Sequence, residues 1–305
     1  MAVDPQPGGA YSRERADAVL RGLELAITRR LDGLLHGNYL GLMPGRGSEP
    51  GESREYHPGD DVRRIDWPVT ARTTIPHVRE TEADRELETW VVYDASASLA
   101  FGTAYSEKRD VALAALAAIV FLAVGGGNRI GALIAGTPEL IRIPPRAGRP
   151  HARAMLSRAA AAHEREAGGV GLGPAIDALR RMHHRRGLAV VISDFLGDES
   201  WQEPMRALGT IQQLIGIEVV DPREMTLPDV GVLHMVDPES GEQIEVPTQD
   251  AELRERYAAA ARIQREAIAT GLRRAGAAHL RLQTDRDWLV DIVRFVGEQR
   301  RRRLK

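Results

Sequence analysis

Two aspartates that each follow a strongly apolar stretch are the residues of this sequence best suited to chemistry. Asp94 opens a D-x-S-x-S segment with Ser96 and Ser98, directly after the apolar run at 87–93, and Asp194 follows a second such run. A carboxylate and two hydroxyls in one turn can converge, and hard oxygen ligands of this kind suit Mg²⁺, which keeps several water molecules in its octahedral shell. A structural role is the alternative, in which Asp94 and Ser96 only cap the following helix.

The elements that must position these residues are alternating strands and helices. The runs at 87–93, 188–193 and 214–220 are typical of buried strands, and their alternation with helices predicts an α/β fold with a doubly wound, mostly parallel sheet and helices on both faces. Such sheets bind ligands at the carboxyl ends of their strands, so we expect Asp94 and Asp194 to meet there. The remaining predicted strands cover 129–134, 139–143 and 279–282. Helices are predicted over 106–124, 150–164, 173–185, 199–212, 250–276 and 284–303.

Four segments describe the expected domain organisation. Residues 1–13 are polar and are expected to be a disordered N-terminus, and residues 14–86 hold an amphipathic helix followed by an irregular segment rich in Arg, Asp, Gly and Pro. The α/β domain occupies residues 87–300, with a β-hairpin insertion predicted near 230–247 around Pro-Glu-Ser-Gly. Residues 301–305 form a basic tail.

The composition excludes several classes of protein. The 305 residues include no cysteine, which excludes disulfide scaffolds, thiolate zinc sites and cysteine nucleophiles. Only Lys108 and Lys305 are lysines, so most candidates for a Schiff-base or P-loop lysine are absent. A formal net charge of −2 makes a nucleic-acid binder a weak alternative. The longest apolar run, at 111–124, is shorter than the roughly 20 residues that span a bilayer, so we expect a cytoplasmic protein with no membrane insertion.

The irregular segment at 54–79 interleaves aspartates with arginines. Arginine binds carboxylates in bidentate pairs, so these residues form either a network that fixes the segment to the sheet domain or a recognition surface beside the Asp94 loop. Within the segment, Trp67 is predicted to be a core anchor. As a recognition surface, the segment would use seven residues: Tyr56, Asp60, Asp61, Arg63, Asp66, Trp67 and Arg72.

These patterns resemble a known family. The D-x-S-x-S loop after an apolar strand resembles the metal-ion-dependent adhesion site of von Willebrand factor A-type domains. The string R-E-Y-x-P-G-D-D-x-R-x-I-D-W at 54–67 resembles the signature of the DUF58 family, and the likeness extends over residues 40–300. The resemblance implies metal contact by Asp94, Ser96, Ser98 and, more loosely, Asp194. One position departs from the pattern, because Val170 and Gly171 stand where a threonine hydroxyl is expected, which predicts weak metal binding.

The resemblance also implies a function. Proteins of this kind are associated with MoxR-type AAA+ ATPases, so we expect a non-catalytic protein-interaction module with a degenerate Mg²⁺ site, acting as adaptor or co-chaperone for such an ATPase and a client protein. The alternative from another class is a metal-dependent hydrolase or phosphotransferase that uses the Asp94 loop. A serine nucleophile needs a nearby base, and no histidine lies in a motif with Asp94. The Gly-rich stretch at 169–173 lacks the preceding strand of a dinucleotide site.

Overall fold

The computed structural model describes most of the chain. The described residues are 53–57, 62, 65–79, 88–103, 106–164, 168–197, 199–236 and 243–303. The predicted disordered N-terminus, the amphipathic helix that follows it, and three of the predicted recognition residues, Asp60, Asp61 and Arg63, lie outside these ranges.

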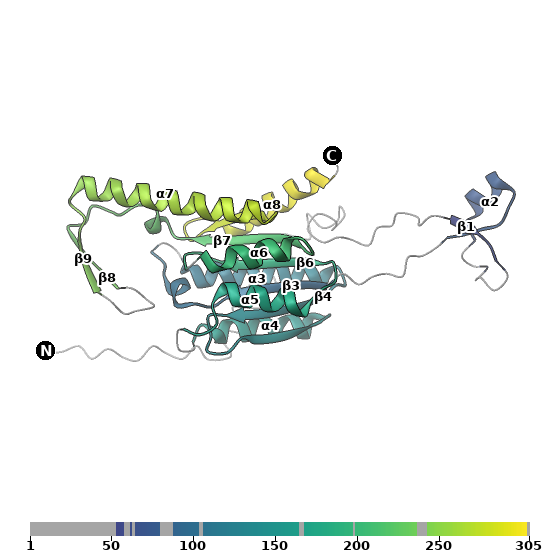
Figure 1. The fold of residues 1–305 in the computed structure, drawn as a ribbon, viewed down its shortest axis with the longest axis horizontal. Helices are drawn as coiled ribbons and strands as arrows, with labels where there is room; N and C mark the ends of the chain where they lie inside the picture. The colour runs from purple at the N-terminus through teal and green to yellow at the C-terminus, as the bar shows by residue number, and fades with distance from the viewer. Residues whose placement is uncertain are drawn as a thin grey trace.

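A six-stranded sheet forms the centre of the molecule (Figure 1), with strand order β10-β7-β6-β3-β4-β5. Four neighbouring pairs are parallel, and only β5 runs antiparallel, to β4. The predicted doubly wound, mostly parallel α/β sheet is therefore confirmed. The strands are β3 (Glu88–Asp94), β4 (Arg129–Ala135), β5 (Ile141–Arg146), β6 (Leu188–Ser193), β7 (Gln213–Val220) and β10 (Ala278–Gln283).

Helices cover both faces of the sheet, because the strands are apolar on both sides. Along β3, Val91 and Tyr93 pack into the core under α3, α4 and α8, whereas Trp90 and Val92 pack into the core under α5, α6 and α7. The last helix begins four residues later than predicted, because Thr284 stays in a buried loop. The helices are α3 (Lys108–Gly125), α4 (Arg149–Ala162), α5 (Leu172–Met182), α6 (Gln202–Gly209), α7 (Ala251–Arg274) and α8 (Trp288–Arg303).

A small unit, formed by β1 (Ser53–Glu55), α2 (Trp67–Thr73) and β2 (His77–Arg79), stands apart from the sheet in Figure 1. Its described part does not lie beside the Asp94 loop, contrary to the prediction. Asp66 is buried and caps α2, since its carboxylate accepts the Val69 N–H at 3.3 Å.

The prediction that Trp67 is a core anchor is wrong. It is 68% exposed, because it is the first residue of a seven-residue helix, α2, that buries none of its side chains. Arg72 is also exposed, and Tyr56 is half-buried. Of the predicted recognition residues that the structure describes, Trp67 and Arg72 are thus the most accessible.

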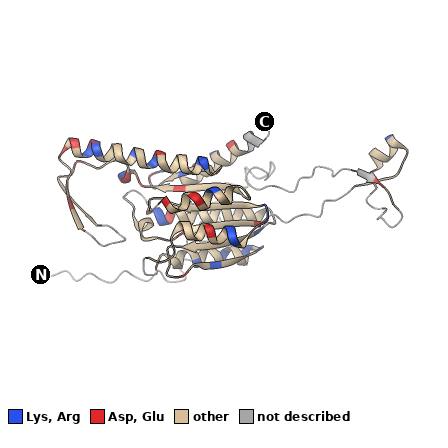
Figure 2. Cartoon of the chain, in the orientation of Figure 1, with Lys and Arg blue, Asp and Glu red and all other residues tan. Residues whose placement is uncertain are grey.

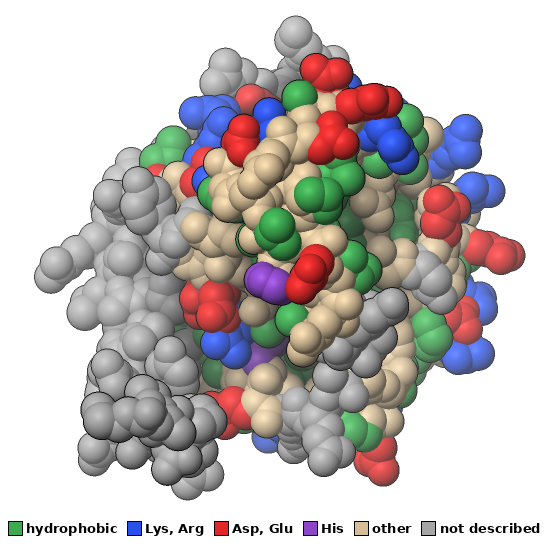
Figure 3. All heavy atoms as spheres, turned by 90° about the vertical axis from the view of Figure 1, so that its left-hand side faces the viewer, with side chains coloured by type: hydrophobic (Ala, Val, Ile, Leu, Met, Phe, Trp, Pro, Cys, Tyr) green, Lys and Arg blue, Asp and Glu red, His purple; other side chains and the backbone are tan. Residues whose placement is uncertain are grey.

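The predicted hairpin is confirmed as β8 (Val232–Val236) and β9 (Gln243–Pro247), an antiparallel pair that precedes α7 and is separate from the main sheet. Figure 3, which faces the left-hand side of Figure 1, shows hydrophobic side chains on this part of the surface, and Val232, Val236 and Ile244 are each more than half exposed. In the described ranges, no helix is both long enough and apolar enough to cross a membrane.

Candidate functional site

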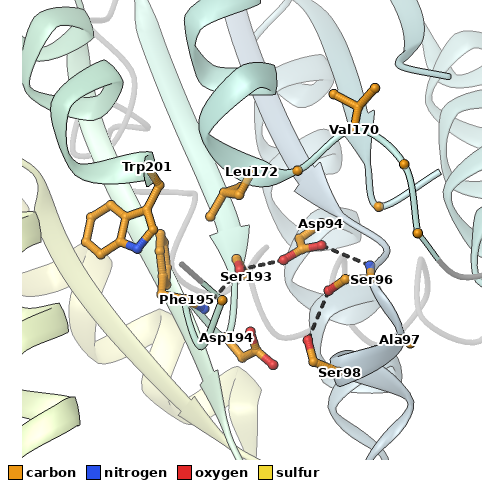
Figure 4. Close-up of a pocket in the computed structure, with 15 residues that line it drawn as sticks. Asp94, Ser96, Ala97, Ser98, Val170, Leu172, Ser193, Asp194, Phe195 and Trp201 are labelled. Atoms are coloured by element: carbon orange, nitrogen blue, oxygen red, sulfur yellow. Dashed lines mark hydrogen bonds between the residues drawn. The ribbon is translucent and has the colours of Figure 1, made fainter. Parts of the chain in front are cut away.

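A cavity of about 390 Å³ opens at the carboxyl ends of β3 and β6. These strands are parallel neighbours with Tyr93 opposite Ile192, so Asp94, which ends β3, and Asp194, which directly follows β6, reach the same edge of the sheet. Both aspartates line the cavity together with Ser96 and Ser98 (Figure 4), as predicted from the sequence. We call this cavity the notch, together with four of the residues that line it, Asp94, Ser96, Ser98 and Asp194.

Asp94 is buried and is held by neutral hydrogen-bond donors. Its Oδ1 accepts the Ser96 N–H at 2.9 Å and its Oδ2 accepts the Ser193 hydroxyl at 2.6 Å (Figure 4), and only 6% of the residue is exposed. Burial raises the pKa of this carboxyl, and the negative charge of Asp194 raises it further, although the hydrogen bonds oppose the shift. Among the described residues, no arginine, lysine or histidine forms an ion pair with Asp94.

Ser96 and Ser98 face each other across the loop, with their hydroxyl oxygens 3.0 Å apart (Figure 4). Ser96 precedes the short 3₁₀ helix η2 (Ala97–Ala100) but makes no side-chain capping bond to it. The next long helix, α3, begins only at Lys108 and is capped by Glu107. The alternative in which Asp94 and Ser96 simply cap the following helix is therefore wrong.

Two glycines let three loops close around the notch. A Cβ on Gly136 would lie 2.3 Å from the Ser96 nitrogen, and a Cβ on Gly169, whose φ is +110°, would lie 2.2 Å from the Thr137 oxygen. Val170 is held against this turn, because its N–H donates to the Thr137 carbonyl at 3.0 Å and its own carbonyl accepts the Gly136 N–H at 2.8 Å. Val170 lines the cavity, so the loop brings a methyl-bearing side chain where the resemblance expects a hydroxyl.

Asp194 is more deeply buried than Asp94, at 1% exposure, and has a different partner. Its Oδ1 accepts the Leu196 N–H at 3.1 Å, and its Oδ2 accepts a hydrogen bond from the Lys108 ammonium at 2.7 Å. Phe195 has a φ of +56°, a left-handed conformation uncommon outside glycine and asparagine. Backbone strain of this kind is concentrated at functional sites, and Phe195 itself lines the cavity.

Sequence reasoning missed two residues of this site, Ser193 and Lys108. Ser193 bridges the two loops, because its hydroxyl donates to Asp94 and accepts the Phe195 N–H at 2.9 Å. Its position in the Ser-Asp-Phe triplet after an apolar strand was a usable signal. The signal for Lys108 was its rarity, since it is one of two lysines in a chain with 41 basic residues.

The donor chemistry of the notch fits a hydrated, hard divalent cation. A carboxylate that has no ionic partner in the described part of the chain borders the cavity together with two hydroxyls, and Mg²⁺ commonly completes its coordination shell with water. Among the described residues, no three or more His, Cys, Asp or Glu side chains form a group that could hold a metal ion. The fit therefore depends on hydroxyl oxygens and water rather than on a cage of carboxylates.

Comparisons with known proteins identify relatives and a family. An uncharacterised protein of Mycobacterium tuberculosis is 57% identical over 285 residues, which cover 93% of this chain and 90% of that protein. An uncharacterised protein of Mycobacterium avium is 47% identical over 164 residues, or 53% of this chain and 96% of that protein.

Two solved structures align with part of this chain. BatB from Bacteroides thetaiotaomicron aligns with a TM-score of 0.46 and 15% identity over 70% of this chain and 98% of its own. The VWA domain of SpRpn10 aligns with a TM-score of 0.38 and 12% identity over 68% of this chain and 93% of its own. The family model described as "Protein of unknown function DUF58" matches residues 52–267, and the chain belongs to that family.

Proposed function

We propose that this protein is a non-catalytic, cytoplasmic interaction module that binds a partner protein through a divalent cation, such as Mg²⁺, held in the notch. The observation that carries the proposal is Asp94, a buried carboxylate that borders an open cavity with two hydroxyls and has no ion-pair partner among the described residues. A buried carboxylate without a counter-charge is costly, and a bound cation would supply that charge.

Three residues of the notch, Asp94, Ser96 and Ser98, supply oxygen ligands in this proposal. Asp94 provides the anionic ligand, and the Ser193 hydroxyl and Ser96 N–H hold its carboxylate in place. Ser96 and Ser98 provide two neutral hydroxyl oxygens that lie 3.0 Å apart, close enough for both to bind the same cation. A cation held by these residues would keep several water molecules, and a carboxylate of the partner protein could replace one of them.

The partner that we propose is a MoxR-type AAA+ ATPase, with this protein as an adaptor or co-chaperone that presents the ATPase to a client protein. The proposal extends the family resemblance, and exposed Trp67 and Arg72 in α2 offer a second contact surface. A nucleic-acid partner is disfavoured, because acidic and basic residues are mixed along α7 and over the sheet domain in Figure 2 rather than separated into one basic face.

An enzyme is the competing function, and the cavity offers it little. The described residues that line the cavity include no histidine, and the hydroxyls of Ser96 and Ser98 hydrogen-bond to each other. A hydrolytic serine needs an adjacent base. A screen for phosphatase and esterase activity in Mg²⁺, with activity lost in Asp94→Asn, would replace the proposal with this alternative.

The proposal is tested by capture of the ATPase on the immobilised full chain. We expect binding in Mg²⁺, loss of binding in EDTA, and loss in Asp94→Ala at any Mg²⁺ concentration. Asp229→Ala is the matched control, because Asp229 is an exposed aspartate that pairs with Arg254 at 3.3 Å, and it should bind like the wild type. Equal capture with EDTA and with Asp94→Ala would remove the cation from the interaction.

A further inference from the structure

Lys108 places a positive charge inside the protein next to the notch. It is the first residue of α3 and is 1% exposed. Its ammonium donates to Asp194 Oδ2 at 2.7 Å and to Glu224 Oε1, and it lies 5.8 Å from the centre of the Phe101 ring. A buried ammonium needs anionic partners, and these contacts supply them.

Glu224 does not depend on Lys108 for its counter-charge. Its other oxygen, Oε2, accepts a hydrogen bond from Arg265 at 2.7 Å, and Arg265 also donates to Glu218 at 3.0 Å and to the Asp194 carbonyl at 3.2 Å. Among the described residues, Lys108 is the only cation paired with the Asp194 carboxylate. The ammonium is therefore the charge that decides whether Asp194 is available to the notch.

We propose that Lys108 is a built-in counter-ion that sets the cation affinity of the notch. This inference rests on the proposed function and deepens it. With Lys108 paired to Asp194, a cation in the notch meets the net charge of one carboxylate, that of Asp94, rather than of two. Lys108 also repels the entering cation, and both effects act at short range in a buried site, where charges interact strongly. The notch is consequently a weak cation site in which Asp194 is not a direct ligand.

The test is the affinity for Mn²⁺ alone, measured by titration calorimetry on the full chain. In Lys108→Met, Asp194 loses its counter-charge, and we expect Mn²⁺ to bind about tenfold more tightly or better. In Asp194→Asn, Lys108 keeps its charge without that partner, and binding should weaken. The double variant Lys108→Met/Asp194→Asn removes both charges and should return to near wild-type affinity, which makes the cycle a measure of the pairwise coupling.

The control for charge removal is Arg129→Met, which deletes a cation paired with Glu88 at 3.4 Å, away from the notch. It should bind Mn²⁺ like the wild type. Near-ultraviolet circular dichroism establishes that each variant is folded. If Lys108→Met does not fold, the Asp194→Asn arm decides, because unchanged affinity there contradicts a role for the Lys108 charge.

The outcomes separate the two proposals. If the wild type binds Mn²⁺ and folded Lys108→Met binds it equally or more weakly, the role of Lys108 is overturned and the proposed cation site stands. No binding by the wild type, with binding by Lys108→Met, supports Lys108 as the residue that suppresses the site. No Mn²⁺ binding by either protein overturns both the cation site and the role of Lys108.

Discussion

Asp94 ends β3 and Asp194 directly follows β6 at the same edge of the sheet, yet the surroundings of the two carboxylates differ. Asp94 is held by a hydroxyl and a backbone N–H, whereas Asp194 is paired with a buried ammonium 86 positions away along the chain. One carboxylate thus has no charged partner among the described residues, and the other is neutralised internally. The comparison shows that two aspartates at one edge of a sheet need not have the same chemistry.

A second buried site differs from the notch because its acidic residues are paired with basic ones. This charged cluster beneath α7 consists of Glu218, Glu224, Arg265, His279 and Arg281. Glu218 is fully buried, and burial alone would raise its pKa, but hydrogen bonds from His279 and Arg281 and the charge of Arg265 outweigh burial and lower the pKa. For Asp94 the balance goes the other way, because its partners carry no positive charge. The charged cluster is therefore internally satisfied, and the notch is not.

Among the substitutions that test this comparison, we expect Arg265→Met to cause the largest loss in the free energy of unfolding. Arg265 is 3% exposed and bridges Glu218 and Glu224, and removing one partner of a buried ion pair costs about 3–5 kcal/mol. We expect urea unfolding to show a loss of that size. Arg273→Met, which removes an exposed pair with Glu266 at 3.3 Å, should cost under about 1 kcal/mol. Equal effects of the two substitutions would contradict the internal role of the cluster.

A pair of neighbouring glycines tests how the notch keeps its shape. Gly168 and Gly169 have similar φ values, +107° and +110°, but only Gly169 faces the Thr137 carbonyl closely. Strain at positive φ costs about 1 kcal/mol or more, so Gly168→Ala should cost that amount. Gly169→Ala should cost about 3 kcal/mol in unfolding free energy, because the clash adds to the strain. Mn²⁺ binding should be lost only in Gly169→Ala, and equal behaviour of the two variants would contradict the loop contact.

His163 extends the comparison to a group that is buried in its neutral form. Its Nε2 lies 2.7 Å from the Tyr93 hydroxyl, and burial, assisted by the charge of Arg109, lowers its pKa to about 4. Between pH 6.5 and about 4 the unfolded chain binds a proton that the folded chain does not. The stability that neutral His163 contributes is therefore fully present above pH 6.5. We expect the free energy of unfolding to fall by about 2 kcal/mol between pH 6.5 and about pH 4, a value that allows for partial exposure of the ring.

Urea titrations at a series of pH values measure this loss. His163→Gln should flatten the pH dependence relative to the wild type, while His234→Gln, at a histidine 74% exposed, should leave it unchanged. A wild-type pH profile in His163→Gln would show that another group carries the dependence.

The smallest expected effect is at Asp94 itself. Because burial and Asp194 disfavour its charge, neutralisation in Asp94→Asn should raise the free energy of unfolding in EDTA by up to about 1 kcal/mol. Asp194→Asn should lower it, since Lys108 then loses a partner. Thermal unfolding in EDTA measures both changes. If the free energy of unfolding changes in the same direction in both variants, the proposed difference between the two carboxylates is contradicted.

The sequence was sufficient for the sheet and for part of the notch. Continuous apolar runs specified the central strands, and the helix predicted to begin at residue 250 is α7, whose N-terminus Asp250 caps by accepting the Glu252 and Leu253 N–H groups. Asp94, Ser96, Ser98 and Asp194 were brought together by the topological rule for parallel sheets, which needs no side-chain detail.

The failures came from contacts between distant segments. Thr284 looked like the start of a helix, but its hydroxyl donates to Asp221, 63 positions earlier, at 2.7 Å. Lys108 was not among the predicted site residues, because its burial depends on ion pairs with Asp194 and Glu224, which lie far away along the chain. Trp67 was expected in a core that the seven-residue α2 does not form. Local pattern carries none of this information.

The most direct test of the cation site is a crystal of the full chain soaked in Mn²⁺ and measured at a wavelength that gives manganese anomalous scattering. We expect one anomalous peak in the notch, within ligand distance of the oxygens of Asp94, Ser96 and Ser98, while the Asp194 carboxylate stays on Lys108. An absent peak, or a peak away from Asp94, would contradict the account.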